Sequence, residues 1–199
     1  MREPGGAPVQ GEALPDLPAP SPWVDSHLPV AARGQRALDL ACGGGRHTIL
    51  IAEAGFDVLA VDRSDEALRQ LTARWAQSQC VRTGDGRLQT NCLDLEGEHW
   101  PLAVGRFGQW DLVVVTNYLY RPYLNELPAM LAHGGLLIYE TFAAGNAAYG
   151  RPSNPEFLLE EGELAEFAHQ HALEVLDFAQ GFVDQPKPSI TQRICARKP

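Results

Sequence analysis

The residues best suited to chemistry form a glycine-rich turn, Gly43-Gly44-Gly45, directly after the short apolar run 37–41. Such a run is typical of a buried parallel strand. Glycine has no Cβ, so the backbone can turn sharply here and approach a ligand closely. A helix predicted over 46–54 begins at this turn and would direct free N–H groups at whatever lies above the strand.

A carboxylate is expected beside this turn. Asp62 ends the next predicted strand, 56–61, where an acidic side chain can accept hydrogen bonds from the two ribose hydroxyls of a nucleoside. Dinucleotides and S-adenosylmethionine are both bound by this layout. The dinucleotide fingerprint requires a third glycine where this sequence has Thr48, so the fit to NAD is incomplete.

The turn instead resembles the first motif of class I S-adenosylmethionine-dependent methyltransferases, an acidic residue followed by a glycine-rich turn. Asp39 stands at the acidic position, and Ala41 stands where the family more often has its first glycine. The resemblance implies that Asp39 lies near the amino-acid end of the cofactor. It also implies that Asp94, after a third strand near 87–93, accepts a hydrogen bond from the adenine amino group, while Leu95 packs on the ring. The predicted cofactor-binding set is Asp39, Ala41, Cys42, Gly43, Gly45, Asp62, Arg63, Asp94, Leu95 and Thr116.

The end of the fourth predicted strand, 112–116, meets both the cofactor methionine and the acceptor in the resembling family. The sequence continues as Asn117-Tyr118-Leu119-Tyr120. This is not the N-P-P-Y run of methyltransferases that act on amino groups of nucleic acid or glutamine, which argues against those acceptors. Tyr118 and Tyr120 either shape a pocket or pack as ordinary amphipathic rings.

Candidate acceptor-side residues follow the fifth predicted strand, 136–139. Glu140 is a candidate general acid or base, and the structural alternative is an ion pair with Arg121 or Arg151. The loop 143–155 is rich in Gly, Asn, Tyr and Pro, and long loops above a parallel sheet are commonly functional. We predict that Glu140, Tyr118 and Arg151 are catalytic and that Asn146, Tyr149, Arg151 and Asn154 face the substrate.

A parallel sheet must position these residues. Helices are predicted after Ser64 and over 121–133 and 157–171, and strands over 173–183 and 189–196. The link 184–188 is too short for a parallel crossover, so the last two strands must run antiparallel. We therefore predict an α/β fold, a Rossmann-like doubly wound sheet of about seven strands, mostly parallel with an antiparallel C-terminal strand. A dinucleotide-binding domain would usually keep its sheet parallel.

The N-terminal region differs in composition from the rest. Residues 1–20 are rich in Pro and Gly and are predicted to be a disordered or loosely attached arm, with the methyltransferase domain spanning 21–199. Ser21 and Pro22 are typical of a helix start, and the helix is expected to place Trp23 and Val30 on one apolar face. Trp23 either covers the cofactor cleft or packs on the sheet.

Overall composition limits the function. A chain of 199 residues can form one domain, and its net charge of −9 argues against a nucleic-acid partner. No apolar run is long enough for a membrane span, and no signal-peptide core follows the first residues. The cysteines lack metal-binding spacing, so we expect no metal and read them as reduced thiols in a cytoplasm. They are Cys42, Cys80, Cys92 and Cys195.

These patterns predict a cytoplasmic enzyme, monomeric or homodimeric, that transfers a methyl group from S-adenosylmethionine to a small-molecule acceptor and leaves S-adenosylhomocysteine. Among small bacterial members, the chain looks most like the compact tellurite-resistance-type and other small-molecule methyltransferases. The alternatives are a catalytically silent cofactor-binding regulatory or partner protein, an RNA or protein methyltransferase, and a nucleotide-dependent oxidoreductase.

Overall fold

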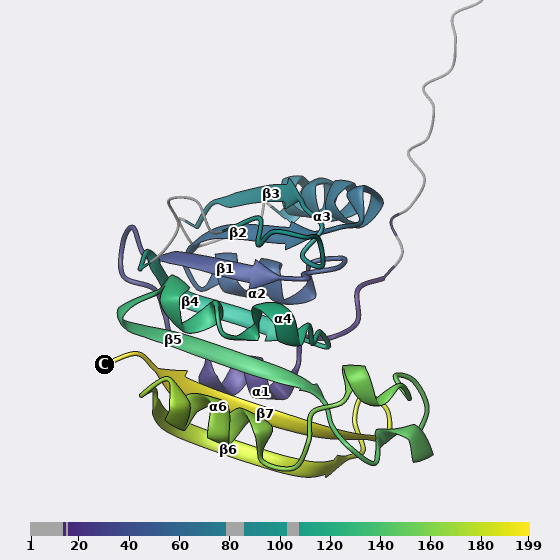
Figure 1. Ribbon diagram of the computed structural model, residues 1–199. Coiled ribbons are helices and arrows are strands. Elements are labelled where there is room, and N and C mark those ends of the chain that lie inside the picture. Colours follow the sequence, from purple (N-terminus) through teal and green to yellow (C-terminus); the bar gives the residue numbers. More distant parts are fainter. Residues whose placement is uncertain (1–13, 15, 79–85, 103–107) are drawn as a thin grey trace, which may run out of the picture.

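The computed structural model describes residues 14, 16–78, 86–102 and 108–199. These form a seven-stranded sheet of order β3-β2-β1-β4-β5-β7-β6 (Figure 1). β7 runs antiparallel to β5 and β6, and the remaining neighbours pair in parallel, so the predicted fold class is confirmed. The strands are β1 (Arg36–Leu40), β2 (Asp57–Asp62), β3 (Leu88–Cys92), β4 (Trp110–Thr116), β5 (Leu131–Phe142), β6 (Glu174–Val183) and β7 (Ser189–Arg197).

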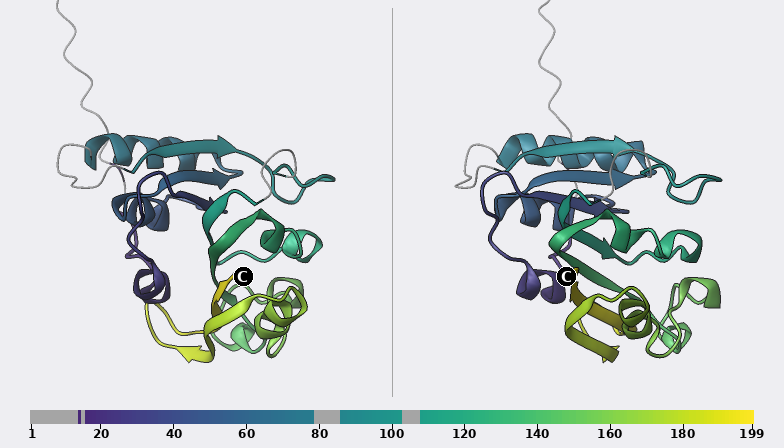
Figure 2. Two further views of the ribbon diagram at one scale, coloured as in Figure 1. Left: turned by 90° about the vertical axis from the view of Figure 1, so that its left-hand side faces the viewer. Right: turned by 60° about the vertical axis from the view of Figure 1, so that its left-hand side comes forward.

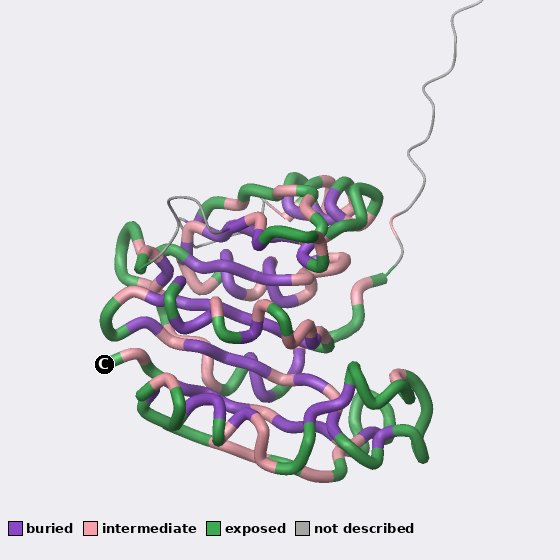
Figure 3. Tube along the Cα trace, in the orientation of Figure 1, coloured by how far each residue is buried: buried purple, intermediate pink, exposed green. Residues whose placement is uncertain are grey.

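Helices cover both faces of the sheet (Figure 2). Apolar side chains of α1, α2 and α3 pack on one face, and those of α4, α5 and α6 pack on the other. The central strands between these layers are largely buried (Figure 3). The helices are α1 (Pro22–His27), α2 (Arg46–Glu53), α3 (Asp65–Ser78), α4 (Arg121–Leu124), α5 (Leu127–Met130) and α6 (Glu163–Gln170), with short 3₁₀ turns η1 (Asn146–Ala148) and η2 (Pro155–Phe157).

The order of the strands determines where a ligand can bind. From β1 the chain passes through α2 to β2, whereas β4 lies on the other side of β1 and leads through α4 and α5 to β5. The chain therefore leaves the carboxyl ends of β1 and β4 in opposite directions. Ligands of open α/β sheets bind at such switch points.

The helix predicted over 121–133 is wrong. The structure has two short helices there, and β5 already begins at Leu131, which pairs with Trp110. Pro128 explains the break, because it has no N–H to donate and its ring would clash with the carbonyl group four residues earlier in a continuous helix.

The helix predicted over 157–171 begins later than expected. α6 starts at Glu163, after Gly162, whose φ of 73° lies in the left-handed region. Leu159, inside the predicted helix, instead pairs with Ala143 in an isolated bridge. The apolar periodicity of this segment was therefore only partly helical.

The first helix is shorter than the apolar pattern indicated. α1 ends at His27, and Val30 is exposed, so its predicted place on an apolar helix face is wrong. Trp23 is buried against the sheet, which confirms the packing alternative, and the Arg193 guanidinium lies 5.1 Å from its ring centroid. Most of the predicted arm, 1–13 and 15, and Cys80 lie outside the described residues.

The glycine turn has its own steric requirements. Gly43 has φ +53° with nothing within 4 Å of a built Cβ, whereas a Cβ on Gly45, at φ +82°, would lie 2.2 Å from Leu71 Cδ1. Leu71 is fully buried and has little room to move.

We therefore expect Gly43→Ala to lower the free energy of unfolding by about 1 kcal/mol, the cost of a left-handed alanine. Gly45→Ala should cost roughly 2–4 kcal/mol, because it adds overpacking against Leu71. Urea denaturation of both variants measures the difference. Equal losses would mean that the Leu71 contact contributes nothing.

Candidate active site

The Asp62 carboxylate joins the turn after β1 to the turn after β2. It accepts hydrogen bonds from the backbone N–H groups of Gly43 and Ser64, each at 2.8 Å. The Cys42 N–H adds a bond of 3.0 Å to the Val61 carbonyl. Ala41 has φ +53°, in the left-handed region that favours glycine. An alanine in place of the family's usual glycine is therefore unusual for its backbone conformation more than for the size of its side chain. These bonds hold the turn at the carboxyl edge of the sheet.

Asp39 is a buried carboxylate, and within the described part of the chain one of its oxygens is hydrogen-bonded and the other is not. Oδ2 accepts a hydrogen bond from the Thr48 hydroxyl, and Oδ1 has no partner among the described residues. Burial raises the pKa of Asp39 to about 7, although the Thr48 bond opposes this shift. An unpaired buried carboxylate oxygen costs free energy unless a donor reaches it. A ligand amino group is a suitable donor.

His47 connects the glycine turn to β4 and to the segment before α1. Its Nε2 accepts a hydrogen bond from the Ser21 N–H at 3.0 Å, so the ring proton must be on Nδ1, which donates to Thr116 Oγ1 at 3.1 Å. Burial lowers the pKa of His47 to about 3, and nearby Arg46 adds to this effect. Sequence reasoning missed His47, because its partners are distant in the chain.

The segment before α1 contacts three parts of the site. The Ser21 hydroxyl donates to Glu140 Oε2 at 2.8 Å, and Arg46 donates to the Ala19 carbonyl at 3.2 Å. A Cβ on Gly44 would lie 3.1 Å from Leu17 Cδ2. Residues 17–21 therefore pass over the start of α2 and reach the end of β5.

Glu140 accepts a hydrogen bond from Ser21, and its role as a general acid or base remains a prediction. It lines none of the three cavities described below. The ion-pair alternative with Arg121 is wrong, because Arg121 instead pairs with Glu163 at 2.7 Å. Among the described residues, Glu140 forms no ion pair with Arg151 either.

A cavity of about 130 Å³ lies beside the turn, and we name it the Asp62–Asp94 cavity. Asp94 is fixed by a 2.9 Å hydrogen bond from the Glu96 N–H to its Oδ1. Several of the predicted cofactor residues thus meet at one place. The lining consists of Ala41, Asp62, Arg63, Leu93, Asp94, Leu95, Glu96 and Tyr118.

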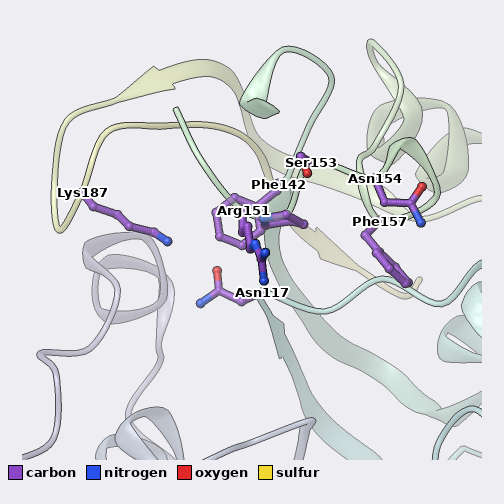
Figure 4. A pocket seen from close by; sticks show the side chains of 8 residues that line it. Asn117, Phe142, Arg151, Ser153, Asn154, Phe157 and Lys187 are labelled. Carbon is purple, nitrogen blue, oxygen red and sulfur yellow. The ribbon is translucent and has the colours of Figure 1, made fainter. Parts of the chain in front are cut away.

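Two further cavities continue from this one along the edge of the sheet. The Tyr118 cavity, about 210 Å³, shares Glu96 and Tyr118 with the first. The Arg151–Lys187 cavity, about 510 Å³, shares four lining residues with the Tyr118 cavity. These shared residues are Asn117, Phe142, Pro152 and Phe157, and most of them are labelled in Figure 4.

Tyr118 lies at the junction of the first two cavities. Its hydroxyl is buried and has no hydrogen-bond partner among the described residues. Burial raises its pKa, and nearby Glu96 adds to the shift. The phenol is therefore protonated at neutral pH and is a hydrogen-bond donor, not a base.

The predicted substrate-facing loop residues divide into two groups. Arg151 and Asn154 line the largest cavity. Asn146 is buried and bonds to the Pro152 carbonyl and the Ile190 N–H, and Tyr149 packs against the Phe182 ring at 5.3 Å. Neither lines a described cavity, so the geometry does not support a substrate contact for them. The sequence did not single out Phe142, Phe157 or Lys187 as lining residues.

Comparisons with known proteins agree with this geometry. The family described as "Methyltransferase domain" matches residues 37–135, which include the turn, Asp62, Asp94 and Tyr118. TehB from Haemophilus influenzae has a crystal structure that superposes with a TM-score of 0.66 at 18% identity, covering 83% of this chain and 58% of that one. Residues 37–135 therefore belong to a methyltransferase domain family, and the fold is that of the class I S-adenosylmethionine-dependent methyltransferases.

Two relatives show the extent of the similarity in sequence. Glycine N-methyltransferase of Mus musculus is 29% identical over 125 residues, 53% of this chain and 39% of the relative. Ubiquinone biosynthesis O-methyltransferase of Bordetella avium (strain 197N) is 26% identical over 172 residues, 76% of this chain and 67% of the relative. The chain thus spans about two fifths of the length of the mouse relative.

These findings confirm the predicted superfamily, and S-adenosylmethionine is the cofactor of methyltransferases of this class. In the parts of the chain that the structure describes, no group of three or more His, Cys, Asp or Glu could hold a metal ion. Within the same residues, no helix has the length and apolar character needed to cross a membrane.

The pKa of His47 predicts acid sensitivity. Its value in the folded state, about 3, lies below the ordinary 6.5, so the unfolded chain binds the proton more readily. Stability from this residue is present above pH 6.5 and is lost as pH falls toward 3. Acidification to about pH 4.5 should cost wild type about 2–3 kcal/mol more than His47→Gln, measured by urea denaturation.

The matched control is His169→Gln, because His169 is exposed on α6. It should lose as much stability on acidification as wild type. If His47→Gln behaves in the same way, His47 is not the buried neutral group that the hydrogen bonds indicate.

Proposed function

We propose that this chain catalyses methyl transfer from S-adenosylmethionine to a small-molecule acceptor. The observation that carries the proposal is the row of adjoining cavities from Asp62 past Tyr118 to Arg151. A donor bound at one end and an acceptor at the other would meet beside Tyr118. Three adjoining cavities offer room for two ligands, whereas a binding protein for the cofactor alone would need only the first cavity.

The residues around the turn fit the methionine part of the cofactor. The unpartnered Oδ1 of Asp39 is a ready acceptor for an amino group. Gly43, Gly45, Ala41 and Cys42 form the bend that lets the backbone approach a ligand. Thr116 supports this region through its bond to His47 rather than by lining a cavity.

The Asp62–Asp94 cavity fits the nucleoside part. Both Asp62 oxygens already accept backbone bonds, which fixes the carboxylate, and each keeps a further lone pair for a ribose hydroxyl. Asp94 would accept from the adenine amino group, while Leu95 and Arg63 line the remaining wall.

The protein's part in the reaction is mainly positioning. When bound, S-adenosylmethionine would supply a methyl group attached to a positively charged sulfur. That sulfur is a good leaving group, because it departs as a neutral thioether. The acceptor's lone pair would form the new bond to the methyl carbon, the carbon–sulfur electron pair would remain on sulfur, and a proton on the nucleophile would leave to solvent. Holding the reacting atoms in line can contribute up to ~10 kcal/mol.

Tyr118 and Glu140 would contribute in different ways. The protonated Tyr118 hydroxyl would orient the nucleophile by donating a hydrogen bond. Glu140, held by Ser21, would position the segment before α1 and not act as a base on the acceptor. Arg151 would bind the acceptor, because it lines the cavity farthest from Asp62.

A small acceptor suits both the dimensions and the charge of the protein. Relatives named for glycine and for ubiquinone biosynthesis illustrate such acceptors. The net charge of −9 disfavours RNA, whose binding requires a basic surface. A cytoplasmic location and a monomeric or homodimeric state belong to this proposal.

Calorimetric titration with S-adenosylhomocysteine tests the cofactor site. We expect micromolar affinity in wild type and a loss of roughly a hundredfold or more in Asp62→Ala, because ribose contacts and the turn are lost together. The matched control is Asp57→Ala, at the opposite end of β2, which should bind normally.

NADH in place of S-adenosylhomocysteine should not bind. If it binds and S-adenosylhomocysteine does not, the assignment is wrong. Cofactor binding without methyl transfer to any thiol, amine, phenol or oxyanion would instead identify a silent binding protein.

The pKa of Asp39 predicts a pH-dependent affinity. Because the carboxyl ionises at about pH 7 when free, an ammonium group can pair with it fully only above that pH. The affinity for S-adenosylhomocysteine should fall about tenfold for each pH unit below 7. Titrations from about pH 5.5 to about pH 8.5 measure the slope, which Asp39→Asn should abolish. A flat wild-type profile would remove Asp39 from the amino-group site.

A further inference from the structure

The Arg151–Lys187 cavity is positively charged in a protein of net charge −9. Arg151 comes from the loop between β5 and α6, and Lys187 comes from the link between β6 and β7. Separate segments thus bring cations to one cavity, and Figure 4 shows both charged ends pointing toward Asn117. No Asp or Glu is among the described residues that line it.

Neither cation is neutralised within the described part of the chain. The Arg151 guanidinium has no hydrogen bond or ion pair there, and the Lys187 ammonium lies over the Phe142 ring, 5.6 Å from its centroid. Arg121, by contrast, is paired with Glu163. Both residues are exposed to solvent beside this open cavity, and unpaired cations there raise the local concentration of anions.

The rest of the lining suits an organic body. The Phe142 and Phe157 side chains offer apolar surface, and Ser153 and Asn154 add polar groups. The cavity volume of about 510 Å³ lies in the range that organic ligands occupy. An inorganic oxyanion would leave most of this space unfilled.

The unpaired cations lie at one end of the row of cavities, because Arg63 in the Asp62–Asp94 cavity is paired with Glu96 at 3.9 Å. No Lys or Arg lines the Tyr118 cavity, which lies between the cations and the Asp62–Asp94 cavity. A ligand with one anionic end would therefore bind in a single direction. Its opposite end would lie beside Tyr118, next to the expected position of the methyl donor.

We infer that the methyl acceptor is an organic anion whose carboxylate or phosphate is bound by Arg151 and Lys187, with its nucleophilic atom in the Tyr118 cavity. The inference rests on the proposed function, because it requires a methyl donor in the Asp62–Asp94 cavity. It adds the substrate class and the roles of both cations.

Binding of unreactive probes tests the anion site. Benzoate and phenyl phosphate should bind the protein saturated with S-adenosylhomocysteine at least ~tenfold more tightly than benzamide, because charge-assisted hydrogen bonds need the anion. Arg151→Gln and Lys187→Gln should each weaken anion binding by roughly tenfold while changing S-adenosylhomocysteine affinity less than about twofold. The control Arg33→Gln, in the turn before β1, removes the same charge and should change neither affinity.

Turnover of matched acceptor pairs tests the orientation. Hydroxybenzoate and 3-mercaptopropionate should be preferred over their amides in kcat/KM. Arg151→Gln should raise KM for the anions with little change in kcat, and Arg151→Lys should restore part of the loss, because the charge alone supplies part of the binding.

The outcomes distinguish failure of the anionic-acceptor inference from failure of the proposed methyl transfer. Normal S-adenosylhomocysteine binding with equal affinity for benzoate and benzamide would overturn the inference and leave the proposed function standing. Methylation of selenite without any organic anion would likewise overturn it. Absence of S-adenosylhomocysteine binding would instead overturn the proposed function. Preference for benzoate or for phenyl phosphate would support the inference and identify the anionic group.

Discussion

The hydrogen bonds from Gly43 and Ser64 to the Asp62 carboxylate are the constraint on which the candidate site depends. They tie the turns after β1 and β2 together, so the backbone keeps its left-handed residues at Ala41 and Gly43. The same turn begins α2, which carries His47 into the interior. One side chain therefore fixes the bend, the start of a helix and the wall of a cavity. Removing it would disturb more than a ligand contact.

The first half of this arrangement could be predicted from sequence. The turn, Asp62 and the Ser64 cap are local signals, and the structure shows the Ser64 hydroxyl accepting a bond from the Ala67 N–H at 3.2 Å. The antiparallel C-terminal hairpin also followed from local information, because the link 184–188 is too short to cross the sheet. Where nearby residues determine the geometry, the sequence is informative.

The acceptor side could not be predicted in the same way. Lys187 lies in a proline-rich link, where nothing local indicates that its side chain lines the same cavity as Arg151. Asn146 has a side chain that could bind a ligand, yet both ends of its amide are already hydrogen-bonded to backbone. It donates to the Pro152 carbonyl and accepts from the Ile190 N–H. Such outcomes depend on how loops distant in the chain fold against each other. Apolar periodicity also misled where a proline or glycine interrupted a helix, as at Pro128.

The contacts of Ser21 have a consequence for how the chain assembles during synthesis. Its hydroxyl bonds to Glu140, and Trp23, two residues later, packs beneath Arg193. Each of these partners follows the α1 region by more than a hundred residues, so neither has been made when α1 leaves the ribosome. Until they are made, the tryptophan lacks part of its cover, and transiently exposed apolar surface of this kind favours aggregation. The packing around α1 is therefore completed only after Arg193 of β7 has been made.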